Sequence, residues 1–189
     1  MRFESTPIPG AWVIEVQRHA DERGWFTRTW CRREFADHGL PADFPQGNLS
    51  FNSRRGTLRG MHFQKSPSME GKLVRCGSGS VFDVIIDLRP HSPAFMGHFG
   101  VVLSAENGHS LFVPPGCAHG FETLEDNSEV VYAMTDFHAP ALGGGVRWND
   151  PAFGIAWPIE RPAVMSDRDR EYPDCAPTQF EMFRGYRIQ

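Results

Sequence analysis

The stretch Leu73-Val-Arg-Cys-Gly-Ser-Gly-Ser-Val-Phe-Asp-Val-Ile-Ile-Asp-Leu88 carries the clearest structural signal in the chain. It indicates two strands joined by the Gly-Ser-Gly turn at residues 77–79, because short runs of valine and isoleucine interrupted by glycine and serine are typical of β-structure. The run at residues 80–88 is the strongest strand candidate in the sequence, and we expect it to lie centrally in a sheet.

Similar runs occur on both sides of this stretch, separated by frequent turn residues. The 19 glycines and 15 prolines recur at short intervals instead of clustering. Turn signals at this spacing favour an all-β sandwich or barrel. We expect further strands at residues 12–16, 24–30, 97–103, 110–113 and 129–135.

Helical signals are weak and short. Residues 32–38 predict a short helix ended by Gly39, and Ser166 predicts the cap of a single turn that runs through Arg170. Residues 172–189 have no periodic pattern, so we expect them to be irregular and to form a mobile tail or an interface arm. At 189 residues and without a linker, the chain is expected to be a single domain.

The composition is that of an ordinary globular protein, with 40% hydrophobic and 22% charged residues. The formal net charge of -4 argues against a nucleic-acid partner, since such domains usually carry a basic excess. No apolar run approaches the length of a membrane span, and the first residues lack the apolar segment of a signal peptide. The four cysteines form no C-x-x-C pair, so we expect reduced thiols and a cytoplasmic protein without a membrane partner.

His62 lies in the run Arg55-Gly-Thr-Leu-Arg-Gly-Met-His-Phe-Gln64. In an extended segment His62 would share a face with Gly60 and Gln64, and Arg59 would point the other way. A bend at Gly60 would bring Arg59 back to the same cavity. A lone histidine is more often a hydrogen-bonded structural residue than a catalytic one, so the interpretation as a base depends on a second polar group with a matching role.

His119 follows the turn Pro114-Pro-Gly116, and this arrangement resembles the second motif of the cupin barrels. Many cupins hold a metal with a His-x-His pair and this later histidine. Here the first motif reads His62-Phe-Gln64, and Glu70 is poorly placed to supply the missing ligand. Three good nitrogen or carboxylate ligands are not evident, so we expect no metal and no other cofactor.

Three further residue types would suit proton transfer beside a carbonyl group. An inward Lys72 would stabilise an enolate, and Tyr132, which shares a strand face with Val130 and Met134, would donate a proton. A solvated lysine and a core tyrosine are the ordinary alternatives. Either Asp169 or Asp83 would bind His62 on its Nδ1 side and raise its basicity, and spacing alone leaves both open.

A longer set of motifs runs in order from about residue 8 to about residue 170: Asp21-Glu-Arg-Gly-Trp-Phe26, Gln46-Gly-Asn-Leu-Ser50, Gly56-Thr-Leu-Arg-Gly-Met-His-Phe-Gln64, Gly71-Lys-Leu-Val-Arg-Cys76, Val81-Phe-Asp-Val84, Leu103-Ser-Ala-Glu-Asn107, Pro115-Gly-Cys-Ala-His-Gly-Phe121, Trp148-Asn-Asp-Pro151 and Trp157-Pro158. Together they resemble the dTDP-4-dehydrorhamnose 3,5-epimerase family. The resemblance implies a cupin-type double-stranded β-helix, or jelly-roll, with short peripheral helices. It also implies a homodimer with exchanged strands and catalysis without a metal.

The resemblance assigns a role to each matching position. His62 matches the general base, Asp169 its carboxylate partner and Tyr132 the general acid. Lys72 and His119 match groups that contact the sugar and its keto oxygen. The remaining matches lie toward the nucleotide and its diphosphate: Arg23, Phe26, Arg59, Gln46 and Asn48.

Four positions depart from the family pattern, and all belong to the nucleotide end of the site. Arg28 and Gly143 replace glutamates, His138 replaces a tyrosine that stacks on thymine, and Arg168 replaces a lysine. The departures leave open whether the substrate carries dTDP, GDP, CDP or UDP. They predict a weakened preference for thymidine.

The expected reaction is inversion at C3, C5 or both in a nucleotide-diphospho-4-keto-6-deoxy-hexose, whose C4 ketone acidifies the neighbouring C–H bonds. Two alternatives stay open. A keto-sugar isomerase on the same scaffold would not need Tyr132 on the opposite face of the sugar. A non-catalytic sugar-nucleotide-binding cupin would not need the complete set of proton-transfer residues.

Overall fold

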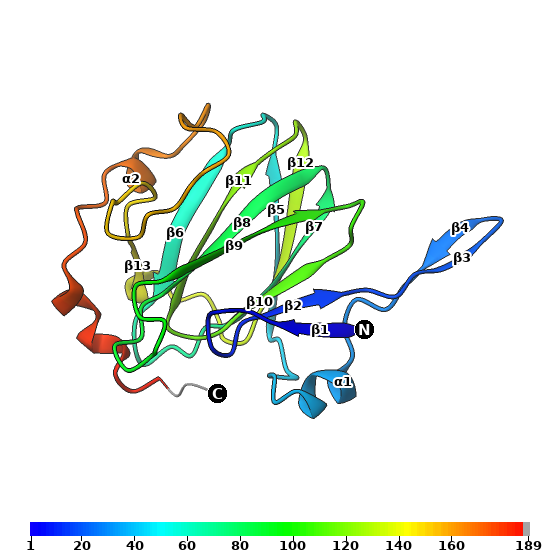
Figure 1. The fold of residues 1–189 in the computed structure, drawn as a ribbon, viewed down its shortest axis with the longest axis horizontal. Helices are drawn as coiled ribbons and strands as arrows, with labels where there is room; N and C mark the ends of the chain where they lie inside the picture. Colours follow the sequence, from blue (N-terminus) through cyan, green and yellow to red (C-terminus); the bar gives the residue numbers. More distant parts are fainter. Residues whose placement is uncertain (187–189) are drawn as a thin grey trace.

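Two antiparallel sheets face each other in the computed structural model, which describes residues 1–186 (Figure 1). The six-stranded sheet has the order β1 (Arg2–Ser5), β2 (Trp12–Glu15), β10 (Ser110–Val113), β7 (Lys72–Ser78), β12 (Ser128–Met134) and β5 (Gln46–Asn52). The five-stranded sheet has the order β13 (Gly143–Gly145), β6 (Leu58–Gln64), β11 (Cys117–Thr123), β8 (Ser80–Asp87) and β9 (His98–Ser104). The all-β, cupin-type jelly-roll expectation is therefore confirmed.

Short helices lie at the periphery, as expected. α1 (Arg32–Asp37) ends before Gly39, and α2 (Asp167–Arg170) begins after Ser166, whose hydroxyl accepts a hydrogen bond from the Asp169 amide. Two 3-10 turns, Pro140–Leu142 and Pro177–Phe183, complete the helical content of the described chain.

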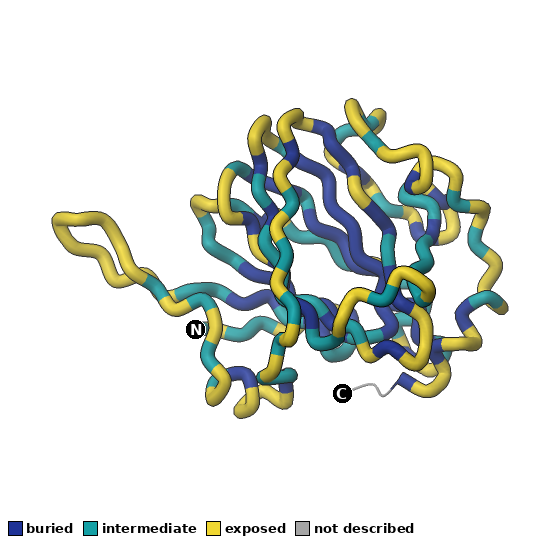
Figure 2. The backbone as a smooth tube through the Cα atoms, turned by 180° about the vertical axis from the view of Figure 1, so that it is seen from behind, coloured by how far each residue is buried: buried dark blue, intermediate teal, exposed yellow. Residues whose placement is uncertain are grey.

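The predicted strands at residues 12–16, 80–88, 97–103, 110–113 and 129–135 are present with small shifts at their ends. The strand predicted at residues 24–30 is wrong beyond Phe26, where β4 (Gly24–Phe26) ends. β4 pairs only with β3 (His19–Asp21), and this hairpin projects from the barrel (Figure 1). All six of its strand residues are exposed, and the burial view shows the hairpin standing free of the sheets (Figure 2).

Alternation along β8 separates two cores, one on each face of the five-stranded sheet. Val81 and Ile85 point between the sheets, where they meet Val74, Leu111 and other apolar residues. Val84 and Ile86 point outward into a second cluster that residues 146–186 supply. A sheet covered on both faces needs continuous apolar strands, which explains why residues 80–88 give such a strong signal.

The C-terminal segment is a correction to the sequence-based expectation. Phe180, Phe183 and Tyr186 are buried in the second cluster, against the outer face of the five-stranded sheet. The prediction that residues 172–186 are irregular is wrong at Pro177–Phe183, which form a 3-10 turn, and the segment is packed on its own barrel and is not a free tail. The last three positions of the predicted segment, 187–189, lie outside the described residues.

A bulge in β6 determines which side chains face the space between the sheets. His62 pairs with His119 and Arg59 with Phe121, so between these pairs two residues on β6 oppose one on β11. The extra residue is Gly60, which has a φ of 139° and lies so close to β11 that a Cβ would be 2.6 Å from the Gly120 Cα. The bulge reverses the alternation, and Arg59 and His62 consequently share one face, as a bend at Gly60 would require.

Candidate active site

A cavity of about 980 Å³ opens between the two sheets, beside α2. β6 and β11 supply one wall, and β5, β7 and β12 supply the other. Ten of the thirteen residues proposed from sequence line this space: His62, Tyr132, Asp169, Lys72, Gln46, Asn48, Arg59, His119, His138 and Arg168. The barrel thus brings together groups that are far apart in the chain.

His62 is paired with Asp169 across the edge of the five-stranded sheet. The Nε2 atom of His62 lies 2.7 Å from Oδ1 of Asp169, and the second carboxylate oxygen accepts a 3.2 Å hydrogen bond from the Gly60 amide. The pairing left open in the sequence is therefore with Asp169. The expected atom was wrong, however, because the carboxylate binds Nε2 and leaves Nδ1 for the other partner.

The carboxyl group of Asp169 is buried, yet its pKa lies below the usual value for an aspartate. Burial alone would raise its pKa, but hydrogen bonding and charge from His62, with the Gly60 amide and Ser166, lower the pKa below its usual value. An ionised carboxylate only accepts hydrogen bonds, so Nε2 of His62 carries the proton in this pair. The lone pair of the neutral imidazole then lies on Nδ1.

Asp83 serves the second histidine. Both of its carboxylate oxygens lie within hydrogen-bond distance of Nε2 of His119, at 2.9 and 3.0 Å, and both residues are buried. β8 and β11 are neighbours in the sheet, and Asp83 and His119 lie on the same inward face. Pairing with His119 removes the cost of burying an isolated aspartate in a central strand.

Tyr132 faces the histidines from the opposite sheet. It lies on β12 with Met134, and both side chains line the cavity, as the alternation predicted. Burial, followed by the negative charge of Glu70, raises the pKa of Tyr132, whereas Arg59 lowers it to a smaller extent. The phenol therefore stays protonated at neutral pH and can donate a proton.

Lys72 is partly buried in the same wall and forms an ion pair with Glu70. The Glu70 side chain is only 5% exposed and lines the cavity. From the sequence, Glu70 is expected only to be a poorly placed metal ligand, and its pairing with Lys72 is not predicted. Its spacing from Lys72 by two residues was the available signal, because alternate residues of an extended segment share a face.

The nucleotide-end residues on β5 and nearby form a short polar chain along the cavity. Gln46 donates from Nε2 to Asn48 Oδ1 at 3.0 Å, and its Oε1 accepts from the His138 amide at 2.9 Å. Arg59 donates from Nε to Oδ1 of the buried Asn52 at 2.8 Å. Asn52 was not anticipated from the sequence.

Three proposed substrate-binding residues do not lie in this cavity. Arg23 and Phe26 are on the projecting hairpin, where Arg23 pairs with Asp21 and Phe26 is 73% exposed. Arg28 follows the hairpin and forms a 2.8 Å ion pair with Glu34 of α1. The hairpin points away from the barrel, so Arg23 and Phe26 lie apart from the cavity of their own chain (Figure 1).

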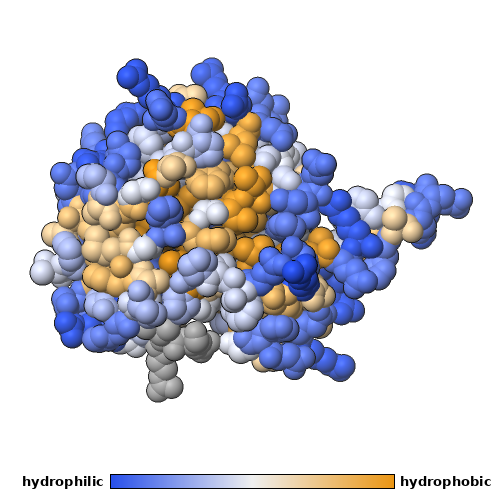
Figure 3. Space-filling view, viewed as in Figure 1, coloured by the Kyte–Doolittle hydropathy of each residue, from blue (hydrophilic) through white to orange (hydrophobic). Residues whose placement is uncertain are grey.

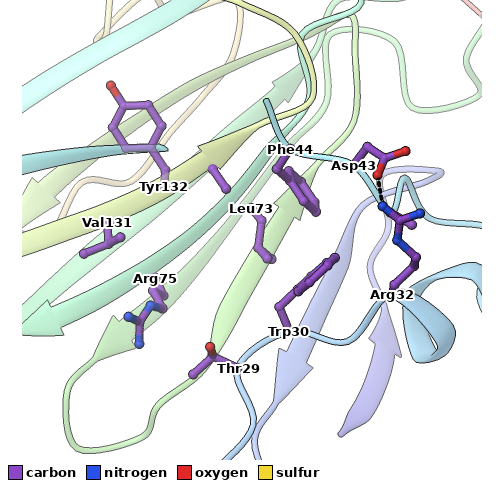
Figure 4. A pocket seen from close by; sticks show the side chains of 11 residues that line it. Thr29, Trp30, Arg32, Asp43, Phe44, Leu73, Arg75, Val131 and Tyr132 are labelled. Atoms are coloured by element: carbon purple, nitrogen blue, oxygen red, sulfur yellow. Dashed lines mark hydrogen bonds and ion pairs between the residues drawn. The ribbon is translucent and has the colours of Figure 1, made fainter. Parts of the chain in front are cut away.

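A second hollow, of about 460 Å³, lies on the outer face of the six-stranded sheet. Trp30, Phe44, Leu73 and Val131 contribute to its lining. Figure 4 shows the Tyr132 ring pointing away from the Trp30 and Phe44 rings. The hollow is mainly apolar and lacks the histidines, so it offers no comparable chemistry.

Two further observations concern residues 1–186. Among residues 1–186, no three or more histidine, cysteine, aspartate and glutamate side chains gather in a way that could hold a metal ion. Within the same residues, no helix is both long and apolar enough to cross a membrane.

Comparisons with known proteins point to one family. The family model described as dTDP-4-dehydrorhamnose 3,5-epimerase matches residues 5–176. A dTDP-4-dehydrorhamnose 3,5-epimerase of Salmonella typhimurium is 41% identical over 169 residues, 89% of this chain and 92% of that protein. The one from Methanothermobacter thermautotrophicus is 42% identical over 173 residues, 90% of this chain and 92% of that protein.

Solved structures agree with the sequence comparison. The crystal structure of dTDP-4-dehydrorhamnose 3,5-epimerase from Elizabethkingia anophelis has a TM-score of 0.88 at 37% identity, covering 92% of this chain and 96% of that one. A 3'-monoepimerase from Streptomyces bikiniensis in complex with dTDP-quinovose has a TM-score of 0.86 at 31% identity, covering 94% of this chain and 90% of that one. The barrel and the two histidine–aspartate pairs agree with these matches. The chain therefore belongs to the dTDP-4-dehydrorhamnose 3,5-epimerase family.

Proposed function

We propose that this chain is an epimerase that inverts C3, C5 or both in a nucleotide-diphospho-4-keto-6-deoxy-hexose. Family membership supports the reaction class, and named relatives include both 3,5-epimerases and a 3'-monoepimerase. The C4 ketone makes the neighbouring protons acidic, so the reaction needs a base, a group that stabilises the enolate and an acid on the other face.

His62 is the base, and its Nδ1 atom takes the proton. Asp169 holds Nε2–H at 2.7 Å and stabilises the imidazolium that forms, while the Gly60 amide holds Asp169 in place. The 36% exposure of the His62 side chain leaves the ring accessible from the cavity.

Lys72 and His119 stabilise the negative charge that develops on the C4 oxygen. Both line the cavity, and each has a carboxylate behind it: Glu70 for Lys72, and Asp83 for His119. These carboxylates hold the two groups in fixed directions. Lys72 donates from its ammonium group, and His119 donates from Nδ1 when its ring is protonated, because Asp83 holds Nε2–H. Donors that are already oriented stabilise a developing charge without reorganising during the reaction.

Tyr132 returns the proton from the opposite face of the sugar, which inverts the centre. The observation that carries the proposal is the placement of His62 and Tyr132 on facing sheets of one cavity. A keto-sugar isomerase has no need of a proton donor opposite the base, and a binding protein has no need of the His62–Asp169 pair.

Solvent exchange tests the reaction directly. The enzyme is incubated with dTDP-4-keto-6-deoxyglucose in deuterated water, and C3 and C5 are followed by NMR. Deuterium at C3, C5 or both, with the inverted configuration, is the expected result and also gives the number of inversions. Movement of the keto group would identify an isomerase, and no exchange with any of the dTDP, UDP, CDP and GDP forms would contradict the proposal.

We further propose a homodimer in which the hairpin of one chain completes the cavity of the other. The hairpin is exposed on both strands, and β5 is an open edge that carries Gln46 and Asn48 into the cavity. Leu49 and Phe51 of β5 are 60% and 52% exposed, so this open edge presents an apolar surface to a partner. Most of the hairpin is hydrophilic, which suits contact with a phosphorylated ligand (Figure 3).

Mixing two inactive variants tests this arrangement. In His62→Ala the barrel lacks its base, and in Arg23→Ala the hairpin lacks its guanidinium. If the hairpin acts on the partner's cavity, mixed dimers contain one intact site and activity returns. Absence of recovery, together with a monomeric mass by light scattering, would contradict the exchanged arrangement.

The substrate is a nucleoside diphosphate sugar, and the protein works in the cytoplasm. Arg59 and Arg168 give the cavity two cationic groups suited to a diphosphate. The four cysteines are all free, which fits a reducing compartment.

A further inference from the structure

Two arginines of the cavity are held in the same manner. Arg59 donates from Nε to Asn52 at 2.8 Å, and Arg168 donates from Nε to the hydroxyl of Tyr172 at 2.9 Å. Within residues 1–186, neither arginine uses its two terminal nitrogens in a hydrogen bond. Each guanidinium is therefore fixed on one side and keeps free the edge that binds a phosphate in bidentate fashion.

Tyr172 is itself well anchored. It follows α2 and is half-buried, and its ring lies against Gly145 of β13 so closely that a Cβ there would be 2.2 Å from the ring. Gly145 is the strand partner of His62, and the centroids of the His62 and Tyr172 rings are 6.4 Å apart at an angle of 66°. A glycine at residue 145 is what allows the tyrosine to occupy this place.

An anchored partner matters because a free arginine side chain loses rotamer freedom when it binds a ligand. The hydrogen bond that Arg168 donates to the Tyr172 hydroxyl limits this loss for Arg168, which is otherwise an exposed side chain. We propose that Tyr172 is a positioning residue that holds the Arg168 guanidinium so that its terminal nitrogens bind the diphosphate of the substrate. The assignment of the anion rests on the function proposed above.

Tyr172→Phe tests the inference, because it removes the hydroxyl and keeps the ring beside His62 and Gly145. Inorganic pyrophosphate is the probe, and its affinity is measured by calorimetry. We expect binding about fivefold weaker than in the wild type, since a hydrogen bond to a charged group is lost. For turnover we expect KM to rise by a similar factor while kcat stays nearly unchanged, because the His62–Asp169 pair is intact.

Tyr186→Phe is the matched control. It makes the same chemical change, but its hydroxyl binds the Ser68 carbonyl in the second core, away from Arg168. We expect it to lower the melting temperature and to leave pyrophosphate affinity as in the wild type.

Arg168→Met completes a double-mutant cycle with Tyr172→Phe. In the Arg168→Met background the second change is expected to have no further effect on pyrophosphate binding. Wild-type affinity in Tyr172→Phe, or an effect of the same size with and without Arg168, would overturn the inference. Because pyrophosphate binding needs no turnover, these outcomes are distinct from a failure of C3 or C5 exchange, which would count against the proposed function.

Discussion

The carboxylate of Asp169 contacts His62, which lies 107 positions earlier in the chain. Its second oxygen accepts a hydrogen bond from the amide of the bulged Gly60. One side chain thus orients the His62 ring and also stabilises the β6 bulge that turns His62 toward the cavity. Loss of the carboxylate is expected to affect the chemistry more than the barrel, whose cores do not depend on it.

His62→Ala is expected to abolish exchange at C3 and at C5 together, because one base serves both positions. Asp169→Asn should lower kcat by about 10²- to 10⁴-fold, since the imidazolium loses its negative partner. Deuterium incorporation read by NMR measures both variants, and circular dichroism checks that they fold. Exchange near the wild-type rate in a folded His62→Ala protein would assign the base elsewhere.

The Asp169 carboxyl also predicts a pH dependence of stability. Its pKa is lowered in the folded protein, so its contribution is present above the ordinary value of about 3.9 and is lost as the pH falls through the lower folded pKa. Asp169→Asn should therefore reduce the melting temperature at pH 7 and have a smaller effect at pH 3. An equal effect at both pH values would show that the charge is not responsible.

Tyr132→Phe is expected to impair inversion more than proton removal. The base and the groups around the C4 oxygen remain, so solvent deuterium should still enter the substrate while little epimer forms. The measurement is the ratio of exchange to epimer formation, both from one NMR time course. A ratio equal to that of the wild type would mean that another group or a water delivers the proton.

Glu122 offers a stability prediction remote from the chemistry. It is fully buried on β11, one carboxylate oxygen accepts from the Ile159 amide at 3.0 Å, and the other has no partner among the described residues. Burial raises the pKa of Glu122, although the Ile159 hydrogen bond and Arg55 oppose this. Stability is therefore expected to fall as the pH rises from about 4.3 through the raised folded pKa.

Glu122→Gln should remove this pH dependence. At pH 8 the variant is expected to be more stable, with a free energy of unfolding about 1 kcal/mol larger than that of the wild type. The reason is that a neutral amide costs less to bury than a carboxylate. At pH 4 the two proteins should be similar. Calorimetric melting across this range decides the matter, and a variant that is less stable at pH 8 would show that the carboxylate has a partner.

Dialysis against a chelator is expected to leave activity unchanged. Among residues 1–186, only His62 and His119 approach a cupin-type metal site, and no three or more histidine, cysteine, aspartate and glutamate side chains gather in a way that could hold a metal ion. The check is the epimerisation rate before and after treatment. Activity that disappears and returns with a divalent ion would require a metal in the mechanism.

We expect a weaker preference for thymidine than is typical of the family. His138 lines the cavity and has a smaller ring than tyrosine, so part of the roughly 1–3 kcal/mol typical of base stacking is lost. The affinities of dTDP, UDP, CDP and GDP for one preparation give the comparison, and His138→Tyr should strengthen dTDP binding. A clear dTDP preference that neither His138→Tyr nor Arg28→Glu alters would remove these positions from the explanation.

Sequence patterns predicted the strands that are apolar on both faces and the side chains that alternate regularly, such as Tyr132 and Met134. They missed β1, β3, β5, β6, β11 and β13 as strands, because glycines and polar residues interrupt these segments. They also could not place Arg23, since a hairpin that leaves the barrel has the same local signals as one that packs on it. The Nε2 contact of His62 depends on where α2 docks, which no local pattern records.

Asp169 follows every strand of the barrel in the chain, since β13 ends at Gly145. During synthesis, all the strands therefore leave the ribosome before the residue that completes the His62 pair. A nascent chain that stops before α2 contains both facing sheets and an imidazole without its carboxylate. Catalytic competence is thus a late event in the maturation of this protein, and the appearance of activity reports the docking of the segment after the barrel.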